Sequence, residues 1–182
     1  GTEEIDEIVK NTNLEGKSIL DIGCGCGGAA FHLIKKYKAK SVEGIDPEHL
    51  VIETAHKLAK KNNLSELATF KQIKPGPLKY VDGSFDVVFS KEAFLHIPDK
   101  EALLKDVHRV LKPDGLVIVS DWMRIDDNTP SAQMKEYIEA EGLDMLMCSL
   151  KKYKELLELT KFTEIEIRDR NEWYLQKAKK EL

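Results

Sequence analysis

The run Ser18-Ile19-Leu20-Asp21-Ile22-Gly23-Cys24-Gly25-Cys26-Gly27-Gly28 is the most informative part of this chain, because an apolar segment stops there at a cluster of glycines. A short apolar run bounded by glycine is typical of a buried strand. Glycines let the backbone turn tightly and let a ligand approach its atoms closely. Residues 27–37 then follow a helical pattern. The run therefore predicts a strand, a ligand-approachable loop and a helix.

Further strands and helices alternate on the C-terminal side of this unit. Apolar runs predict strands at residues 42–45, 69–73, 85–89 and 116–120, and the alternation of residues 163–167 predicts an edge strand. Helices are expected at residues 3–11, 27–37, 131–141, 149–160 and 172–182. A further helix is expected to start after Asp46, with Pro47 at its first position. Another is expected to end at a turn formed by residues 112–115. This order predicts a doubly wound, mostly parallel sheet in a three-layer α/β/α arrangement.

We interpret residues 1–182 as one domain with three parts: a core at 1–121, a helical segment at 122–160, and a last strand and helix at 161–182. The 28 basic and 32 acidic residues give a net charge of −4, which argues against a nucleic-acid partner. No apolar stretch is long enough for a membrane span. An odd count of three cysteines and the lack of a recognisable leader favour the cytoplasm. Cys24 and Cys26 have no second pair at ligand spacing, so we expect no metal.

The glycine loop has two interpretations. Gly23-x-Gly25-x-x-Gly28, with Asp46 downstream, matches a dinucleotide fingerprint. However, Asp21 at the strand end would oppose a pyrophosphate, whose negative charge belongs at the helix N-terminus. A carboxylate there suits a ligand that carries an ammonium and a sulfonium, such as S-adenosylmethionine.

Four ordered motifs make the second interpretation specific. They are Asp21-Ile22-Gly23-Cys24-Gly25-Cys26-Gly27, Asp46 after the second strand, residues 82–88 at the fourth strand, and residues 111–116 before the fifth. Together they resemble the class I S-adenosylmethionine-dependent methyltransferases. The resemblance assigns cofactor binding to Asp21, Gly23, Cys24, Gly25, Gly27, Asp46, Pro47, Lys74, Pro75 and Ser90. Asp46 matches the residue that holds the ribose hydroxyls in that family.

The sequence departs from the family at the end of the third strand. Lys74 stands where an acidic residue usually accepts from the adenine amino group, and a lysine can only donate. Pro75 follows, and proline has no N–H to donate to an adenine ring nitrogen. We expect Gln72 or a residue from 76–80 to substitute, or binding to be weaker by about 1 kcal/mol per lost hydrogen bond.

Residues 89–97, 120–122 and 129–137 are similar to phosphoethanolamine and sarcosine or dimethylglycine N-methyltransferases. This resemblance implies a small-molecule amine acceptor and gives His96 a part in its deprotonation. It also implies that Trp122 and Tyr137 line the acceptor pocket. The chemistry is coherent, because a histidine can take a proton near neutral pH and aromatic faces attract a methylated ammonium.

Other features of the phosphobase enzymes are not recognisable here. Glu141 and Leu143 stand where those enzymes bind phosphate with an arginine and a tyrosine, so a neutral or cationic amine is easier to accept. We find no N-terminal lid with its tyrosine and no seventh strand. A sheet with an open edge can pair with a second copy, so a homodimer is possible.

Two further hypotheses stay open. A methyltransferase fold that serves binding or assembly without catalysis is motivated by Lys74-Pro75 and the absent lid. A nicotinamide oxidoreductase is motivated by the glycine spacing alone.

Overall fold

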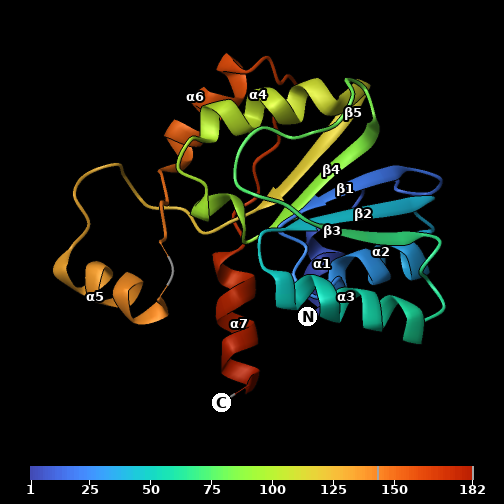
Figure 1. Cartoon of the computed structure of the whole chain (residues 1–182). Coiled ribbons are helices and arrows are strands. Elements are labelled where there is room, and N and C mark those ends of the chain that lie inside the picture. The colour runs from blue at the N-terminus through green and yellow to red at the C-terminus, as the bar shows by residue number, and fades with distance from the viewer. Residues whose placement is uncertain (143, 182) are drawn as a thin grey trace.

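The computed structural model describes residues 1–142 and 144–181 and shows strands alternating with helices (Figure 1). The elements are α1 (Thr2–Ile8), β1 (Ser18–Ile22), α2 (Gly28–Tyr37), β2 (Ser41–Asp46), α3 (His49–Lys61), β3 (Ala68–Gln72), β4 (Phe85–Lys91), the 3-10 helix η1 (Phe94–His96), α4 (Lys100–Val110), β5 (Leu111–Ser120), α5 (Ala132–Glu141), α6 (Leu150–Leu159) and α7 (Asn171–Glu181).

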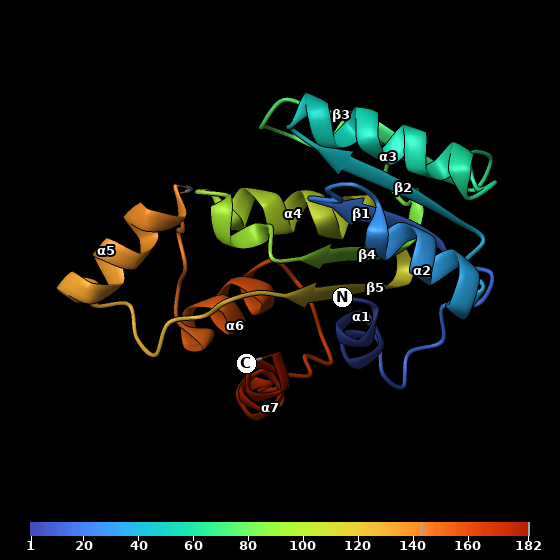
Figure 2. The same cartoon turned by 90° about the horizontal axis from the view of Figure 1, so that it is seen from below.

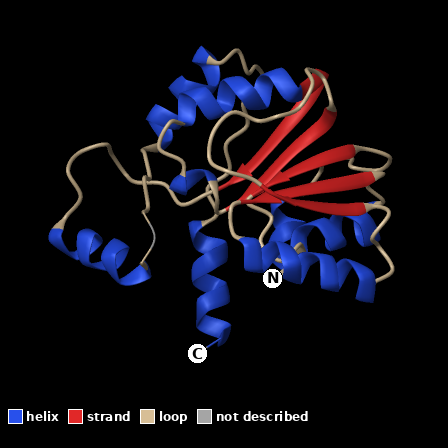
Figure 3. Ribbon diagram, viewed as in Figure 1, coloured by secondary structure: helices blue, strands red, loops and turns tan. Residues whose placement is uncertain are grey.

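The described strands form one parallel sheet in the order β3-β2-β1-β4-β5 (Figure 3). From β1 the chain adds β2 and then β3 on one side. It then crosses to the other side of β1, where β4 and the edge strand β5 are added. The order therefore reverses between β1 and β4, where doubly wound sheets bind their ligands. The predicted fold class is confirmed.

Side chains of each central strand point alternately into two cores, one on each face of the sheet. Ile19 and Val87 pack with α1, α2 and α3 on one face. Leu20 and Val88 pack with α4 and α6 on the other. Figures 1 and 2 show these two helical layers on opposite sides of the sheet. Burial on both faces explains why the central strands read as continuous apolar runs.

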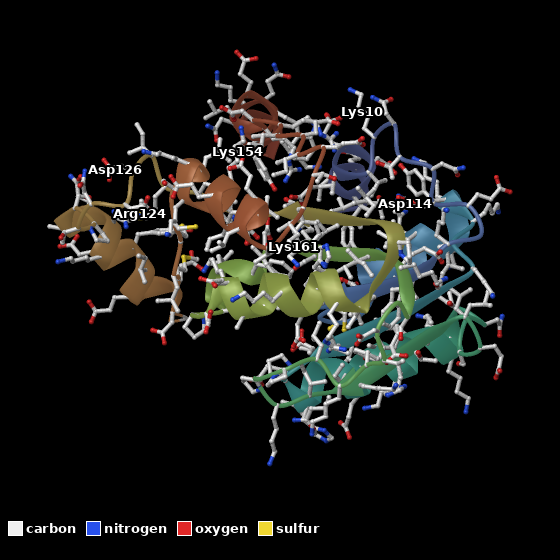
Figure 4. All side chains as sticks on the ribbon, turned by 90° about the horizontal axis from the view of Figure 1, so that it is seen from above. Lys10, Asp114, Arg124, Asp126, Lys154 and Lys161 are labelled. Carbon is white, nitrogen blue, oxygen red and sulfur yellow. The ribbon has the colours of Figure 1, made fainter. Side chains whose placement is uncertain are left out.

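The predicted turn at residues 112–115 exists, but it lies inside β5. Phe85 pairs with Leu111 and Val87 pairs with Leu116, so four residues of β5 loop out between these partners. Asp114 has a positive φ of 60°, as a tight turn requires. Figure 4 labels Asp114 at the turn within β5 and Arg124 in the segment beyond the carboxyl end of β5.

The predicted start of α3 at Pro47 is wrong. Asp46 is the last residue of β2, and its Oδ1 accepts from the Glu48 N–H at 3.0 Å. Pro47 and Glu48 belong to this local turn, and the helix begins at His49. An aspartate before proline signals a turn as well as a helix start, and here the turn is formed.

The predicted edge strand at residues 163–167 is also wrong. Glu164 adopts a positive φ of 52°, which interrupts an extended backbone. The next residues are drawn toward α1, because the Arg168 guanidinium donates to the carbonyl oxygens of Glu7 and Ile8. No strand of the described sheet pairs with this segment. An alternating pattern is therefore not enough without a neighbouring strand.

Residues 122–142 and 144–149, which we call the α5 arm, leave the carboxyl end of β5 and carry α5 away from the sheet (Figure 1). No residue of α5 is buried. The arm returns through a pairing of Arg124 N–H with the Cys148 carbonyl at 3.0 Å. Within the part of the chain that the structure describes, no helix is long and apolar enough to cross a membrane.

Candidate functional site

The glycine loop joins β1 to α2 at the reversal of strand order. The N–H groups of Gly23 and Cys24 both donate to the Ile45 carbonyl, at 2.8 and 3.1 Å. The Gly25 N–H donates to Asp46 Oδ2 at 3.0 Å. Three main-chain N–H groups of the loop are thus bonded to the end of the neighbouring strand β2, two of them to a carbonyl and one to the Asp46 carboxylate.

Two of the glycines are required by space as well as by conformation. Gly23 has a φ of 75°, and a Cβ there would lie 2.2 Å from the Ala93 Cβ. Gly27 has a φ of 82°, and a Cβ there would lie 2.5 Å from the Phe70 ring. A side chain at either position would meet both backbone strain and a collision.

A cavity of about 330 Å³ opens beside this loop. It is lined by Gly1, Thr2, Ile5, Asp21, Gly23, Cys24, Gly25, Gly28, Ala29 and Lys91. Four predicted cofactor residues therefore meet at one cavity, namely Asp21, Gly23, Cys24 and Gly25. The remaining lining comes from Gly1, α1, the start of α2 and the end of β4.

Asp21 is the chemically exceptional group in this cavity wall. Its side chain is 1% exposed, and Oδ2 has no hydrogen-bond partner among the described residues. Burial, assisted by the nearby charge of Asp46, raises its pKa to about 7. A buried carboxylate oxygen without a partner is costly. A cationic group placed in the cavity would remove that cost.

Other predicted cofactor residues surround the loop without lining the cavity. Asp46 keeps a partly exposed carboxylate beside Gly25. The buried Ser90 hydroxyl donates to the Ile22 carbonyl at 2.9 Å, so it fastens β4 to the end of β1. Pro47 is exposed and its carbonyl accepts from Gln72 Nε2 at 3.0 Å.

Lys74 and Pro75 lie on the exposed connection that follows β3. They are not among the residues that line the cavity. The Ile73 N–H donates to the Asp46 carbonyl at 3.0 Å, which brings the start of this connection to the Asp46 side of the loop.

The three predicted acceptor-side residues are separate from the cavity and from one another. His96 lies in η1, and its Nδ1 is 2.8 Å from the Asp144 carbonyl oxygen. Trp122 packs against Tyr174 of α7, with 5.0 Å between the ring centroids and 41° between the ring planes. Tyr137 is 53% exposed on α5, where a hydrogen bond to Glu141 raises its pKa. Leu143 lies outside the described residues.

Lys91 and α1 line the cavity but were absent from the predicted site. Lys91 is the second residue after the predicted fourth strand at 85–89, so its position near the carboxyl edge of the sheet was a usable signal. The contribution of Thr2 and Ile5 had no such signal, because an amphipathic pattern does not say where a helix docks. The described residues contain no group of three or more His, Cys, Asp or Glu arranged to hold a metal ion.

Comparison with known proteins gives a family match. A family described as a methyltransferase domain matches residues 13–179. Among curated proteins, phosphoethanolamine N-methyltransferase 1 of Arabidopsis thaliana is 37% identical over 100% of this chain and 36% of its own length. The protein of the same name from Triticum aestivum is 33% identical, again over 36% of its length. The chain thus spans about a third of the curated relatives it matches.

Solved structures show the same fold. Phosphoethanolamine N-methyltransferase 2 of Haemonchus contortus, in complex with S-adenosyl-L-methionine, has a TM-score of 0.89 at 25% identity and covers 100% of this chain and 41% of that one. A putative sarcosine dimethylglycine methyltransferase from Galdieria sulphuraria has a TM-score of 0.76 at 26% identity, over 87% of this chain and 60% of that one.

Proposed function

Because the chain belongs to the methyltransferase domain family, we propose that it binds S-adenosylmethionine and transfers its methyl group to a small-molecule amine. The observation that carries this proposal is the buried Asp21, which lines the cavity beside the glycine loop and has a carboxylate oxygen without a partner among the described residues. The family match supports the resemblance drawn from the four sequence motifs. The amine acceptor is supported by the names of the relatives, each of which matches over a fraction of its length.

The residues around the cavity fit such a cofactor. Asp21 would face the ammonium of its amino-acid part, because a cation satisfies the unpartnered carboxylate oxygen. The backbone of Gly23 and Gly25 leaves room for a close approach. The Asp46 carboxylate would accept from the ribose hydroxyls while it still holds the Gly25 N–H. When bound, the cofactor supplies an electrophilic methyl group on a sulfonium.

His96 is suited to take a proton from an amine. Its Nδ1 lies 2.8 Å from a carbonyl oxygen, which can only accept, so the hydrogen bond requires a proton on Nδ1. In the neutral ring, Nε2 is then the atom that accepts. Because an amine is nucleophilic only when neutral, a proton acceptor at this edge of the sheet would assist methyl transfer.

The acceptor would enter between η1, the end of β5 and the α5 arm. Trp122 and Tyr174 offer aromatic faces that attract an ammonium that bears methyl groups. The described contacts bring no arginine to Tyr137, and Glu141 is its polar neighbour. These features favour a neutral or cationic amine over one that carries a phosphate.

Calorimetric titration with S-adenosylhomocysteine tests cofactor binding. We expect micromolar affinity in the unmodified protein and a loss of roughly tenfold or more in Asp46→Ala, since hydrogen bonds from ribose to a carboxylate would be removed. Asp82→Ala is the control, because Asp82 is exposed and pairs with Arg109 away from the cavity. Absence of binding at millimolar concentration would reject the proposal and leave a non-catalytic module as the explanation.

A panel of phosphoethanolamine, sarcosine and dimethylglycine with isotopically labelled S-adenosylmethionine tests the acceptor. We expect His96→Asn to lower methyl incorporation roughly a hundredfold, as removal of a general base does, with unchanged affinity for S-adenosylhomocysteine. Equal turnover in His96→Asn and the unmodified protein would remove His96 from the reaction.

The oxidoreductase hypothesis has an electrostatic difficulty. A buried carboxylate in the wall of the cavity would repel a pyrophosphate, and the described cavity lining offers one cationic side chain, that of Lys91, against it. Titration with NADH should therefore produce no change in fluorescence.

A further inference from the structure

The cavity wall includes a second residue with an ionisable side chain, Lys91, at the end of β4. Its side chain is 25% exposed and is held on two sides, with Nζ at 3.0 Å from Glu4 Oε2 and 2.9 Å from Glu92 Oε2. An ammonium has three N–H donors. Two face these carboxylates, and no other acceptor contacts Nζ among the described residues. One donor remains for a ligand in the cavity that Lys91 lines.

Glu4, which holds Lys91, is itself buried and held from the C-terminal side. Its side chain on α1 accepts from the Tyr174 hydroxyl of α7 and lies 3.8 Å from the Arg170 guanidinium. Burial alone would raise the pKa of Glu4, but Tyr174, Lys91 and Arg170 outweigh it and lower the pKa. Glu4 is therefore a carboxylate at neutral pH and a fixed anchor for Lys91.

The two carboxylates beside Lys91 have other partners as well. Glu4 is shared with Arg170, and Glu92 is shared with the Tyr174 hydroxyl, which lies 3.3 Å from Oε1. The cavity thus presents a positive group on β4 and a negative group, Asp21, on the adjacent strand β1. This pair of opposite charges matches a zwitterion, since each charge of the ligand would meet its opposite.

We propose that Lys91 binds the carboxylate of the cofactor's amino-acid part, across the cavity from Asp21, and that Glu4 is a positioning residue for Lys91. The inference rests on the proposed function, because it names how one end of that cofactor is held. In this inference, the Lys91 side chain distinguishes ligands that carry this carboxylate from ligands that lack it. It also makes the docking of α1 and α7 part of the binding site.

Three related ligands separate the two charges. S-adenosylhomocysteine carries both the ammonium and the carboxylate, its decarboxylated form keeps only the ammonium, and methylthioadenosine has neither. In calorimetry, Lys91→Met should lower the affinity for S-adenosylhomocysteine roughly tenfold or more, as loss of a charged hydrogen bond does. It should leave the affinity for the decarboxylated form within about twofold. Lys105→Met, which removes an exposed lysine paired with Glu101 at 2.6 Å, is the matched control.

Glu4→Gln tests the positioning role. It should reduce the preference for S-adenosylhomocysteine over the decarboxylated form by a smaller factor than Lys91→Met and leave methylthioadenosine binding unchanged. Because Lys91→Met leaves Glu4 with one cation fewer, the double variant Lys91→Met/Glu4→Gln is measured beside it, with thermal unfolding to show that each protein is folded. The double variant should bind S-adenosylhomocysteine and its decarboxylated form with affinities that are similar to each other.

An equal loss for all three ligands in Lys91→Met would overturn the inference, because a purely structural lysine would affect the whole cavity. An unchanged affinity for S-adenosylhomocysteine in either Lys91 variant would overturn it as well. Failure of the proposed function is a different result: the unmodified protein would then bind none of the three ligands.

Discussion

The glycine loop and the α5 arm occupy the same edge of the sheet and are built in opposite ways. The loop is bonded by main-chain N–H groups to β2, and two of its glycines leave no room for a side chain. The arm extends from the sheet with a helix that buries no residue. A few contacts at its base hold it, among them Asp127 accepting from the Ser149 N–H at 2.7 Å.

This difference between loop and arm indicates which binding groups must be in position before a ligand binds. The fold itself positions the groups for the cofactor, since packing over-determines the backbone there. The groups on the arm are positioned by few contacts, so we expect their arrangement to respond to an acceptor. Regions with little burial open locally at low free-energy cost.

A matched pair of glycine substitutions should show the largest contrast. Gly23 and Gly142 both have positive φ, at 75° and 69°, but a Cβ at Gly142 would meet nothing within 4 Å. Gly23→Ala adds a collision to backbone strain and should cost roughly 3 kcal/mol or more in the free energy of unfolding. Gly142→Ala should cost about 1 kcal/mol. Urea denaturation measures both, and similar values would contradict the contrast between loop and arm.

The next contrast concerns two buried carboxyl groups, one just before the glycine loop and one just before the α5 arm. Burial, assisted by Asp46, raises the pKa of Asp21 to about 7. Burial, partly opposed by Lys100, raises that of Asp121 at the end of β5 to about 7 as well. An ammonium bound at Asp21 favours its charged form, so binding below about pH 7 should release a proton. Affinity for S-adenosylhomocysteine should then rise with pH up to about 7 and level above it.

Calorimetry in buffers of different ionisation enthalpy measures that proton. At about pH 6 we expect close to one proton released by the unmodified protein. Asp21→Asn should abolish the release, and Asp121→Asn should retain it. If Asp121→Asn abolished the proton release and Asp21→Asn retained it, the ammonium would bind beside Asp121, at the end of β5.

Much of the loop could be predicted from sequence because its determinants are local. The apolar run ending at Gly23 predicted β1 with its observed bounds, and Asp21 stood out because a carboxylate at a buried strand end needs a partner. The start of α3 was missed because Asp46-Pro47 is compatible with two local structures, a helix start and the turn that Asp46 closes.

The rest depended on contacts between distant parts of the chain. Glu4 and Tyr174 are separated by 170 residues, and nothing in either sequence neighbourhood indicates that they meet. The segment 163–167 has a strand-like pattern, but a strand also needs a neighbour, which pattern alone does not supply. For the arm, the family resemblance indicated residue roles, while the exposure of α5 could not be deduced from its sequence.

The smallest expected effect compares two helix caps. Ser131 caps α5 by accepting from the Met134 N–H at 3.1 Å, and Ser149 caps α6 by accepting from the Lys152 N–H at the same distance. Ser149→Ala should lower the free energy of unfolding by about 1 kcal/mol, since α6 packs through Tyr153 and Leu156 into the core. Ser131→Ala should leave global unfolding unchanged and only speed amide hydrogen exchange in α5, because a helix that buries no residue opens on its own. If both caps changed global unfolding equally, α5 would unfold together with the sheet, and the arm would have to be as firmly built as the loop.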